Sequence, residues 1–136
     1  DTTDQQLIYY VGSSAVVLTG QQSKCIVVES VTSTDDNMPI FSFPDAITVS
    51  GVWCQYKGSA PTTPATFTLE DGAGNAMTIT GTNPTCTAPG TNPTPAAVTA
   101  GNSLAAYEML RFDTTNTPNP ATDTYMICVS YTIDRQ

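Results

Sequence analysis

The chain has 136 residues, of which 40% are hydrophobic and 12% are charged, and its formal net charge is −8. This length allows one domain with a buried core, but the four cations are too few to form a basic patch. We therefore expect no nucleic-acid binding. Because no run of about 18 apolar residues occurs, we also expect no membrane insertion.

Short runs rich in Val, Ile, Thr, Tyr and Phe recur between turn clusters, and no segment shows helical spacing of its apolar residues. The pattern predicts an all-β fold with no significant helix. We expect a disulfide-stapled antiparallel β-sandwich, jelly-roll or immunoglobulin-like, with about seven to nine strands. The predicted strands are 7–11, 15–19, 24–32, 39–43, 46–57, 65–70, 76–80, 104–112 and 124–134.

Residues 1–20 form a β-prone arm, and the sandwich domain is predicted over residues 21–136. One interpretation of the arm is a hairpin on the domain's own sheet. The other is a segment that adds a strand to a neighbouring subunit, as donor-strand systems do. The residues predicted to make this contact are Leu7, Ile8, Tyr9, Tyr10, Val11, Val16, Val17 and Leu18.

The run 46–57 is apolar on both sides and contains Gly51, which suggests a bulge or a bend. Alternation along a strand predicts a core side made of Ile47, Val49 and Trp53. It predicts an opposite side made of Val52, Cys54 and Tyr56. That opposite side is too apolar to face water, so we expect segment 81–101, the arm or another subunit to cover it.

Residues 81–101 are predicted to be a Pro/Thr-rich loop, because its four prolines remove backbone donors that a central strand needs. A loop of this length is uncommon unless it is functional or anchored to the rest of the domain, and a disulfide from Cys86 could anchor it. We expect Cys86 to bond Cys54 and to pin the loop over the outer face of the strand that carries Cys54. Cys25 would then bond Cys128, although four cysteines allow three pairings and spacing does not decide among them.

The segment EDGAGNAM, residues 70–77, predicts a hairpin turn with positive φ at Gly72 and Gly74 and local hydrogen bonds from Asp71. This turn would make the strands on either side of it neighbours. The last predicted strand alternates most clearly. Its core side is predicted to be Tyr125, Ile127, Val129, Tyr131 and Ile133.

The chain has no histidine, so the usual general base near neutral pH is missing. Acidic neighbours such as Glu70 and Asp71 are interpreted as turn residues. The cysteines include no C-x-x-C pair of the kind common in zinc sites. We predict neither an enzyme nor a cofactor and name no metal site, although the oxygen-rich turns 34–37 and 71–75 leave calcium binding open.

Aromatic side chains offer an alternative function, since exposed rings can stack on sugars in carbohydrate-binding modules. The tyrosines not assigned to the core are Tyr9, Tyr10, Tyr56 and Tyr107. Trp53 is the single tryptophan, and its register assigns it to core packing. No sugar-binding motif accompanies these residues.

The stretch STDDNMPIFSFPDAITVSGVWCQ, residues 33–55, and the later TDTYMICVSYTID, residues 122–134, resemble small all-β domains among the virion structural and tail-fibre-like proteins of tailed phages. In that pattern an acidic or amide turn leads into a P-I-F-x-x-P-x-A-I-T-V strand that ends in cysteine. A closing strand carries another cysteine. The matching residues are Pro39, Ile40, Phe41, Pro44, Ala46, Ile47, Thr48, Val49, Cys54 and Cys128.

The resemblance covers about residues 24–133 and implies a non-catalytic, self-associating exterior protein, with no binding residues to transfer. We predict a structural subunit of an extracellular assembly, either a virion surface or a cell-surface filament. Its partners would be copies of itself, and its disulfides would form in an oxidising compartment or outside the cell. The alternative is a carbohydrate-binding or adhesion module that contacts a cell-surface glycan or receptor.

Overall fold

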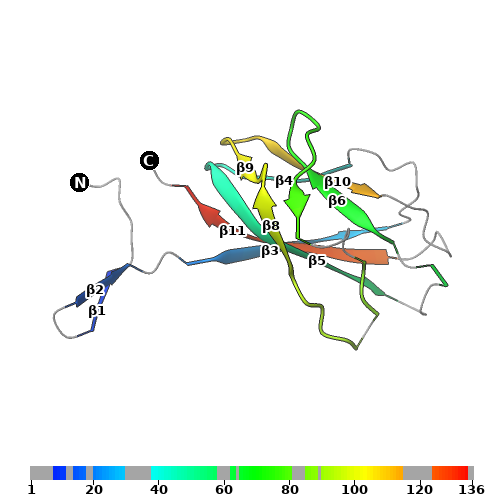
Figure 1. Cartoon of the computed structure of the whole chain (residues 1–136), viewed down its shortest axis with the longest axis horizontal. Coiled ribbons are helices and arrows are strands. Elements are labelled where there is room, and N and C mark those ends of the chain that lie inside the picture. The colour runs from blue at the N-terminus through cyan, green and yellow to red at the C-terminus, as the bar shows by residue number, and fades with distance from the viewer. Residues whose placement is uncertain are drawn as a thin grey trace.

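In the computed structural model of the chain, the described residues are 8–11, 14–17, 20–29, 38–57, 62–63, 65–80, 85–88, 90–114 and 124–134, with the backbone alone for 8–17. Eleven strands run through these residues, with turns and bends between them and no helix. Two antiparallel sheets form a sandwich (Figure 1). The predicted all-β, disulfide-stapled sandwich is therefore confirmed. Within these residues, nothing long and apolar enough to cross a membrane as a helix is present.

The larger sheet has the strand order β3-β11-β5-β8-β7, and β9 also pairs with β5. Its strands are β3 (Gln22–Val28), β5 (Ile47–Lys57), β7 (Thr78–Ile79), β8 (Ala96–Ala100), β9 (Ser103–Leu104) and β11 (Thr124–Ile133). The smaller sheet has the order β4-β10-β6. Its strands are β4 (Met38–Ser42), β6 (Phe67–Glu70) and β10 (Met109–Thr114).

The core lies between the two sheets. Along β11 the residues on one side are buried as predicted, from Tyr125 through Tyr131, with Ile133 partly buried. Phe67 of β6 and Phe112 of β10 stack from the smaller sheet at a centroid distance of 5.0 Å. Apolar side chains on the inner faces of both sheets are thus removed from water, which is the main force that holds the sandwich together.

The strand β5 contains the bulge that Gly51 suggests. In the pairing with β11, Ser130 lies opposite Gly51 while Tyr131 lies opposite Val49, so Ser50 is an extra residue on β5. A Cβ atom on Gly51 would lie 2.6 Å from Ser130 Oγ, which explains why glycine occupies this position. One extra residue reverses which side chains point inward from that point on.

Two predictions about strands need correction. Segment 81–101 is not all loop, because Ala96–Ala100 forms β8, which lies between β5 and β7. The described prolines of this segment, Pro93 and Pro95, precede β8 and remove no donor from it. The predicted strand 104–112 is two strands, β9 and β10, separated by a turn at 105–108.

The turn at 70–77 also differs from the prediction. Asp71 accepts local hydrogen bonds as expected, and Gly74 has φ of 87°, but Gly72 does not have positive φ. A Cβ at Gly72 would lie 2.8 Å from Glu108 Cγ, so close packing explains this glycine instead. After a single bridge between Glu70 and Ala76, the chain crosses from the smaller sheet to β7 of the larger one.

Candidate interaction surface: the outer face of the larger sheet

Trp53 lies on the outer face of the larger sheet, so its predicted core position is wrong. Past the bulge, the buried residues of β5 are Val52, Cys54 and Tyr56, and they join the core. Trp53 and Gln55 point the other way and are partly exposed. The prediction assumed strict alternation along β5 and did not allow for the extra residue Ser50. It therefore assigned every side chain of β5 after Ser50 to the wrong face of the sheet.

The bridge between Cys54 and Cys86 is present, and it is the pairing that the loop argument favours. Its predicted location is wrong, however, because both cysteines are buried in the core rather than on the outer face. The loop lies beside β5 instead of over it. Thr87 N donates to Cys54 O and Tyr56 N donates to Thr87 O, which makes a short parallel bridge at the edge of the strand.

The second bridge joins Cys25 of β3 to Cys128 of β11, residues directly opposite each other in the sheet. Cys128 is fully buried, whereas Cys25 is exposed on the outer face. Cys128 also lies opposite Trp53 on β5. The bridge therefore fixes the edge strand β3 to its neighbour β11 and forms part of the outer face beside the indole.

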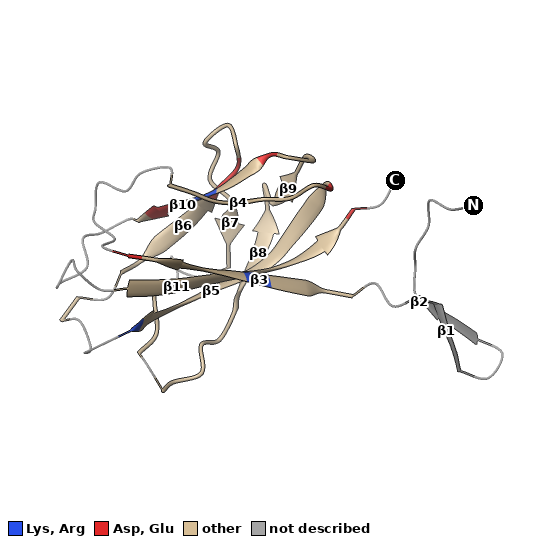
Figure 2. Cartoon of the chain, turned by 180° about the vertical axis from the view of Figure 1, so that it is seen from behind, with Lys and Arg blue, Asp and Glu red and all other residues tan. Residues whose placement is uncertain are grey.

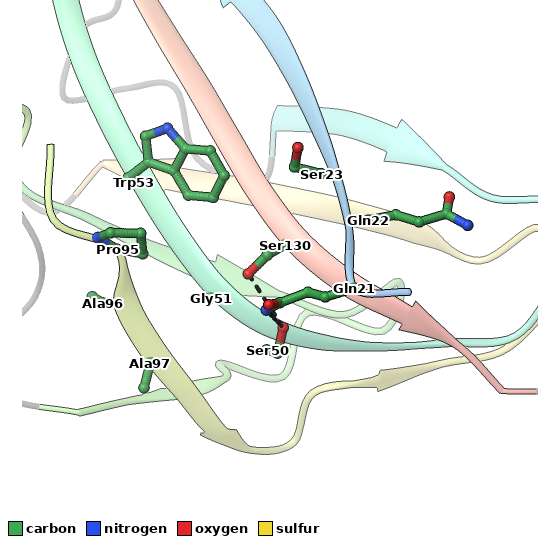
Figure 3. A pocket seen from close by; sticks show the side chains of 10 residues that line it. All are labelled: Gln21, Gln22, Ser23, Ser50, Gly51, Trp53, Pro95, Ala96, Ala97 and Ser130. Carbon is green, nitrogen blue, oxygen red and sulfur yellow. Dashed lines mark hydrogen bonds between the residues drawn. The ribbon is translucent and has the colours of Figure 1, made fainter. Parts of the chain in front are cut away.

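A groove of about 500 Å³ opens beside Trp53, and we call it the Trp53 groove (Figure 3). Its polar side chains are the amide of Gln21 and the hydroxyls of Ser23, Ser50 and Ser130. Gln22 also lines the groove, but its Oε1 accepts a hydrogen bond from the hydroxyl of Tyr131, a core residue. The rest of the lining is Gly51, Trp53, Pro95, Ala96 and Ala97. Gln21 Nε2 donates to Ser50 Oγ at 2.8 Å, and the hydroxyls of Ser50 and Ser130 lie 3.2 Å apart.

A second hollow of about 360 Å³ lies further along the same sheet. Val27, Gln55 and Met126 line it, with Glu29 and Lys57 also present. Val27 is 61% exposed, which is unusual for a large apolar side chain on a strand. Charged residues of the described chain lie mainly at strand ends and in turns, with Lys24 of β3 and Arg111 of β10 as exceptions (Figure 2).

The predicted arm forms two described strands, β1 (Ile8–Val11) and β2 (Ser14–Val17), paired antiparallel with each other. They make a separate two-stranded sheet and join neither sheet of the sandwich. The interpretation as a hairpin on the domain's own sheet is therefore wrong. Leu7 and Leu18 lie outside the described residues, as do the side chains of Ile8, Tyr9, Tyr10, Val11, Val16 and Val17.

The candidate tyrosines divide into two groups. Tyr56 is buried and packs edge-on against Tyr125 at a centroid distance of 6.4 Å, so its assignment as a surface aromatic is wrong. Tyr107 is 75% exposed and has φ of 63°. Glu108 N donates to Ala105 O across this turn, so Tyr107 occupies a turn position that normally requires glycine.

The acidic side chains of the described turns are engaged locally. Hydrogen bonds from Asn75, its side-chain amide first, lower the pKa of Asp71 below its usual value. Glu108 accepts from Gly72 N and Ala105 N, which ties two turns together. Turn 34–37 lies outside the described residues, and the described residues contain no group of three or more potential metal ligands.

Comparison with known proteins adds one structural likeness. No protein-family model matches the sequence, and no curated protein matches it. A solved chain titled cyanophage Pam1 capsid asymmetric unit is similar, with 21% sequence identity and a TM-score of 0.45. The match covers 96% of this chain and 95% of that chain.

Proposed function

We propose that the chain is a non-enzymatic structural subunit of an extracellular assembly, such as a virion surface, and that copies join through strand edges and the N-terminal arm. One observation carries this proposal. A hairpin that belongs to neither sheet of the sandwich precedes β3, a long edge strand with nothing paired on its outer side among the described strands.

The free edge of β3 stands out among the edges of the described sheets. β7 has only two residues, and β4 contains Pro39, which blunts an edge. The edge of β6 is occupied, since Met77 N donates to Leu69 O. In contrast, β3 has seven residues, no proline and an unbroken register with β11.

The single cation of β3, Lys24, does not block the pairing of another strand with this edge. Lys24 Nζ lies 5.1 Å from the ring centroid of Phe41 and 5.0 Å from that of Phe43, so the ammonium reaches across to the smaller sheet. A lysine on an edge strand usually discourages pairing with another chain. Because Lys24 is directed elsewhere, the edge stays open to a strand from a second copy.

The geometry of the Cys25–Cys128 pair shows which backbone groups face the free edge. The Cα atoms of these two residues are 4.1 Å apart, the short spacing of a non-hydrogen-bonded antiparallel pair. The N–H and C=O groups of Cys25 therefore point away from β11. The same holds for Ser23 and Val27, two positions before and after it, so β3 presents a regular row of groups to a new strand.

The hairpin of β1 and β2 supplies a suitable strand. A two-stranded hairpin is marginally stable alone in water and gains stability when it joins a larger sheet. Added to the β3 edge of a neighbouring copy, it would satisfy the open groups of β3. The Cys25–Cys128 bridge would keep β3 attached to its own sheet, so only the residues before it could be exchanged between copies.

The first test compares the full chain with a variant that lacks residues 1–20, at several protein concentrations. Light scattering coupled to size-exclusion chromatography should show oligomers for the full chain and monomers for the deletion variant. Near-ultraviolet circular dichroism should be alike for both, because the sandwich does not need the arm. A full chain that stays monomeric at every concentration would refute the proposal.

The second test addresses the acceptor edge. Val27→Pro removes an N–H that faces the free edge but leaves the hydrogen bonds to β11 in place, so it should abolish association of a folded protein. Val27→Thr is the matched control, since it removes the apolar side chain and keeps the N–H. If Val27→Pro associates as well as Val27→Thr does, β3 is not the acceptor.

A further inference from the structure

We infer that the Trp53 groove binds an uncharged saccharide, a function separate from assembly through the β3 edge. The groove brings together the single tryptophan of the chain and four amide or hydroxyl side chains, those of Gln21, Ser23, Ser50 and Ser130. Trp53 comes from β5, Gln22 and Ser23 from β3 and Ser130 from β11, while Pro95 precedes β8 (Figure 3). Its volume, about 500 Å³, falls within the usual range for small-ligand sites.

The charge of the lining excludes anionic ligands. None of the ten residues around the groove is charged, and the whole chain has a net charge of −8. A phosphate, a uronic acid or a sialic acid would meet no cation here and would be repelled by the protein's overall field. The polar groups that are present are neutral donors and acceptors, which suit hydroxyl groups of a ligand.

The backbone of β5 in the groove cannot accept an added strand. β11 pairs with one side of β5 throughout, and β8 pairs with the other side at Gly51 and Val52. An extended peptide would find no unpaired row of backbone groups along β5, and the open row of β3 lies at the edge of the sheet, where the arm is proposed to add. A lipid chain is also a poor match, because half of the ten lining residues carry an amide or a hydroxyl.

A sugar ring fits both halves of the lining. Its C–H face can pack on the partly exposed indole of Trp53, and its hydroxyls can bond the exposed side chains of Gln21 and Ser23. The site is also held in shape. Ser50 and Ser130 lie within hydrogen-bonding distance of each other beneath Gln21, and the Cys25–Cys128 bridge sits beside the indole. A preformed groove lowers the ordering cost of binding.

Fluorescence of the full chain tests the site directly, because Trp53 is the single tryptophan. The probes are uncharged trisaccharides of glucose, mannose, galactose and N-acetylglucosamine, with trigalacturonate as the charged comparison. At least one uncharged probe should shift the Trp53 emission saturably below about 10 mM, and trigalacturonate should not. By calorimetry, Trp53→Ala should abolish this binding, Trp53→Tyr should retain part of it and Gln21→Ala should weaken it about tenfold.

Tyr107→Ala is the matched control, because it removes an exposed aromatic ring on a turn outside the groove. Its affinity should equal that of the unchanged chain. The inference is overturned if no uncharged probe binds, if trigalacturonate binds equally well or if binding survives Trp53→Ala. It is also overturned if the Trp53 emission shifts on self-association alone, since a second copy would then fill the groove. Light scattering measures assembly independently, so either proposal can fail without the other.

Discussion

The two faces of the larger sheet use the same strands for opposite purposes. The inner face of β5 and β11 is apolar and closed by the smaller sheet, with Val52, Tyr125 and Ile127 fully buried. The outer face carries Trp53 and the exposed Cys25. The comparison teaches that one inserted residue, Ser50, sets which side chains of β5 belong to which face.

The two disulfides follow the same division. Cys54–Cys86 lies in the core and draws a proline-rich segment to the edge of β5, whereas Cys25–Cys128 holds an edge strand at the surface. Loop length alone favours the second bridge, which spans 103 residues against 32. The difference in loop entropy between the two bridges is only about 1 kcal/mol. Removing Cys54–Cys86 would also leave a cavity in the core, so we expect this bridge to contribute more to the free energy of unfolding.

The largest expected effect comes from removing the core bridge. Cys54→Ala with Cys86→Ala should lower the free energy of unfolding by about 5 kcal/mol, since it frees the loop and leaves a cavity. Cys25→Ala with Cys128→Ala should cost about 3 to 4 kcal/mol and leave a folded protein. Urea unfolding of both variants measures the difference. A larger loss for the surface bridge would contradict the ranking.

Next in size is the contrast between two aromatic residues of β5. Tyr56→Ala should lower the free energy of unfolding by about 3 kcal/mol, because the ring is buried against Tyr125. Trp53→Ala should cost less than about 1 kcal/mol, since the indole lies on the outer face. Chemical denaturation compares the two. Equal losses would mean that Trp53 is part of the core after all.

The bulge itself gives a smaller effect. Gly51→Ala places a Cβ against Ser130 Oγ and should cost about 1 to 2 kcal/mol of unfolding free energy. In a Ser130→Ala background the same change should cost less, because the crowded oxygen is gone. A double-mutant cycle of thermal unfolding measures this coupling, and strictly additive effects would argue against the close approach.

At Tyr107, in contrast, a substitution should increase the stability of the protein. Tyr107→Gly should raise the free energy of unfolding by about 0.5 to 1 kcal/mol, because glycine adopts positive φ without strain. Tyr107→Ala keeps the strain and serves as the control, with little change in stability. Thermal unfolding distinguishes them, and a loss of stability in the glycine variant would show that the ring itself contributes to packing.

The smallest effect concerns the turn that contains Asp71, which lies outside both faces. Its pKa is lowered in the folded chain, so its contribution is present above the unfolded pKa and is lost as the pH falls through the folded pKa. Stability should therefore decline slightly as the pH drops below about 4. Asp71→Asn should show a flatter profile in urea unfolding from pH 6 to 2, and an unchanged slope would count against this role.

The β character of the chain was predictable because alternation of apolar and polar residues reports on local faces. The predicted core side of β11 is confirmed along the whole strand. The predicted pairing of Cys86 with Cys54 is also confirmed, and it follows from the need to anchor a long proline-rich segment. Gly51 also marked the bulge. The alternation and the glycine are local features of the sequence, and the bridge follows from the length and composition of the loop, although its two cysteines are 32 residues apart.

Only the tertiary structure decided the faces of Trp53 and Tyr56, the existence of β8 and the position of the loop beside β5. Each depends on a partner strand far along the chain. The insertion at Ser50 is defined by its pairing with Ser130, and the short run Ala96–Ala100 becomes a strand because β5 and β7 pair with it. Strand pairing between distant segments supplies this information, and local alternation does not carry it.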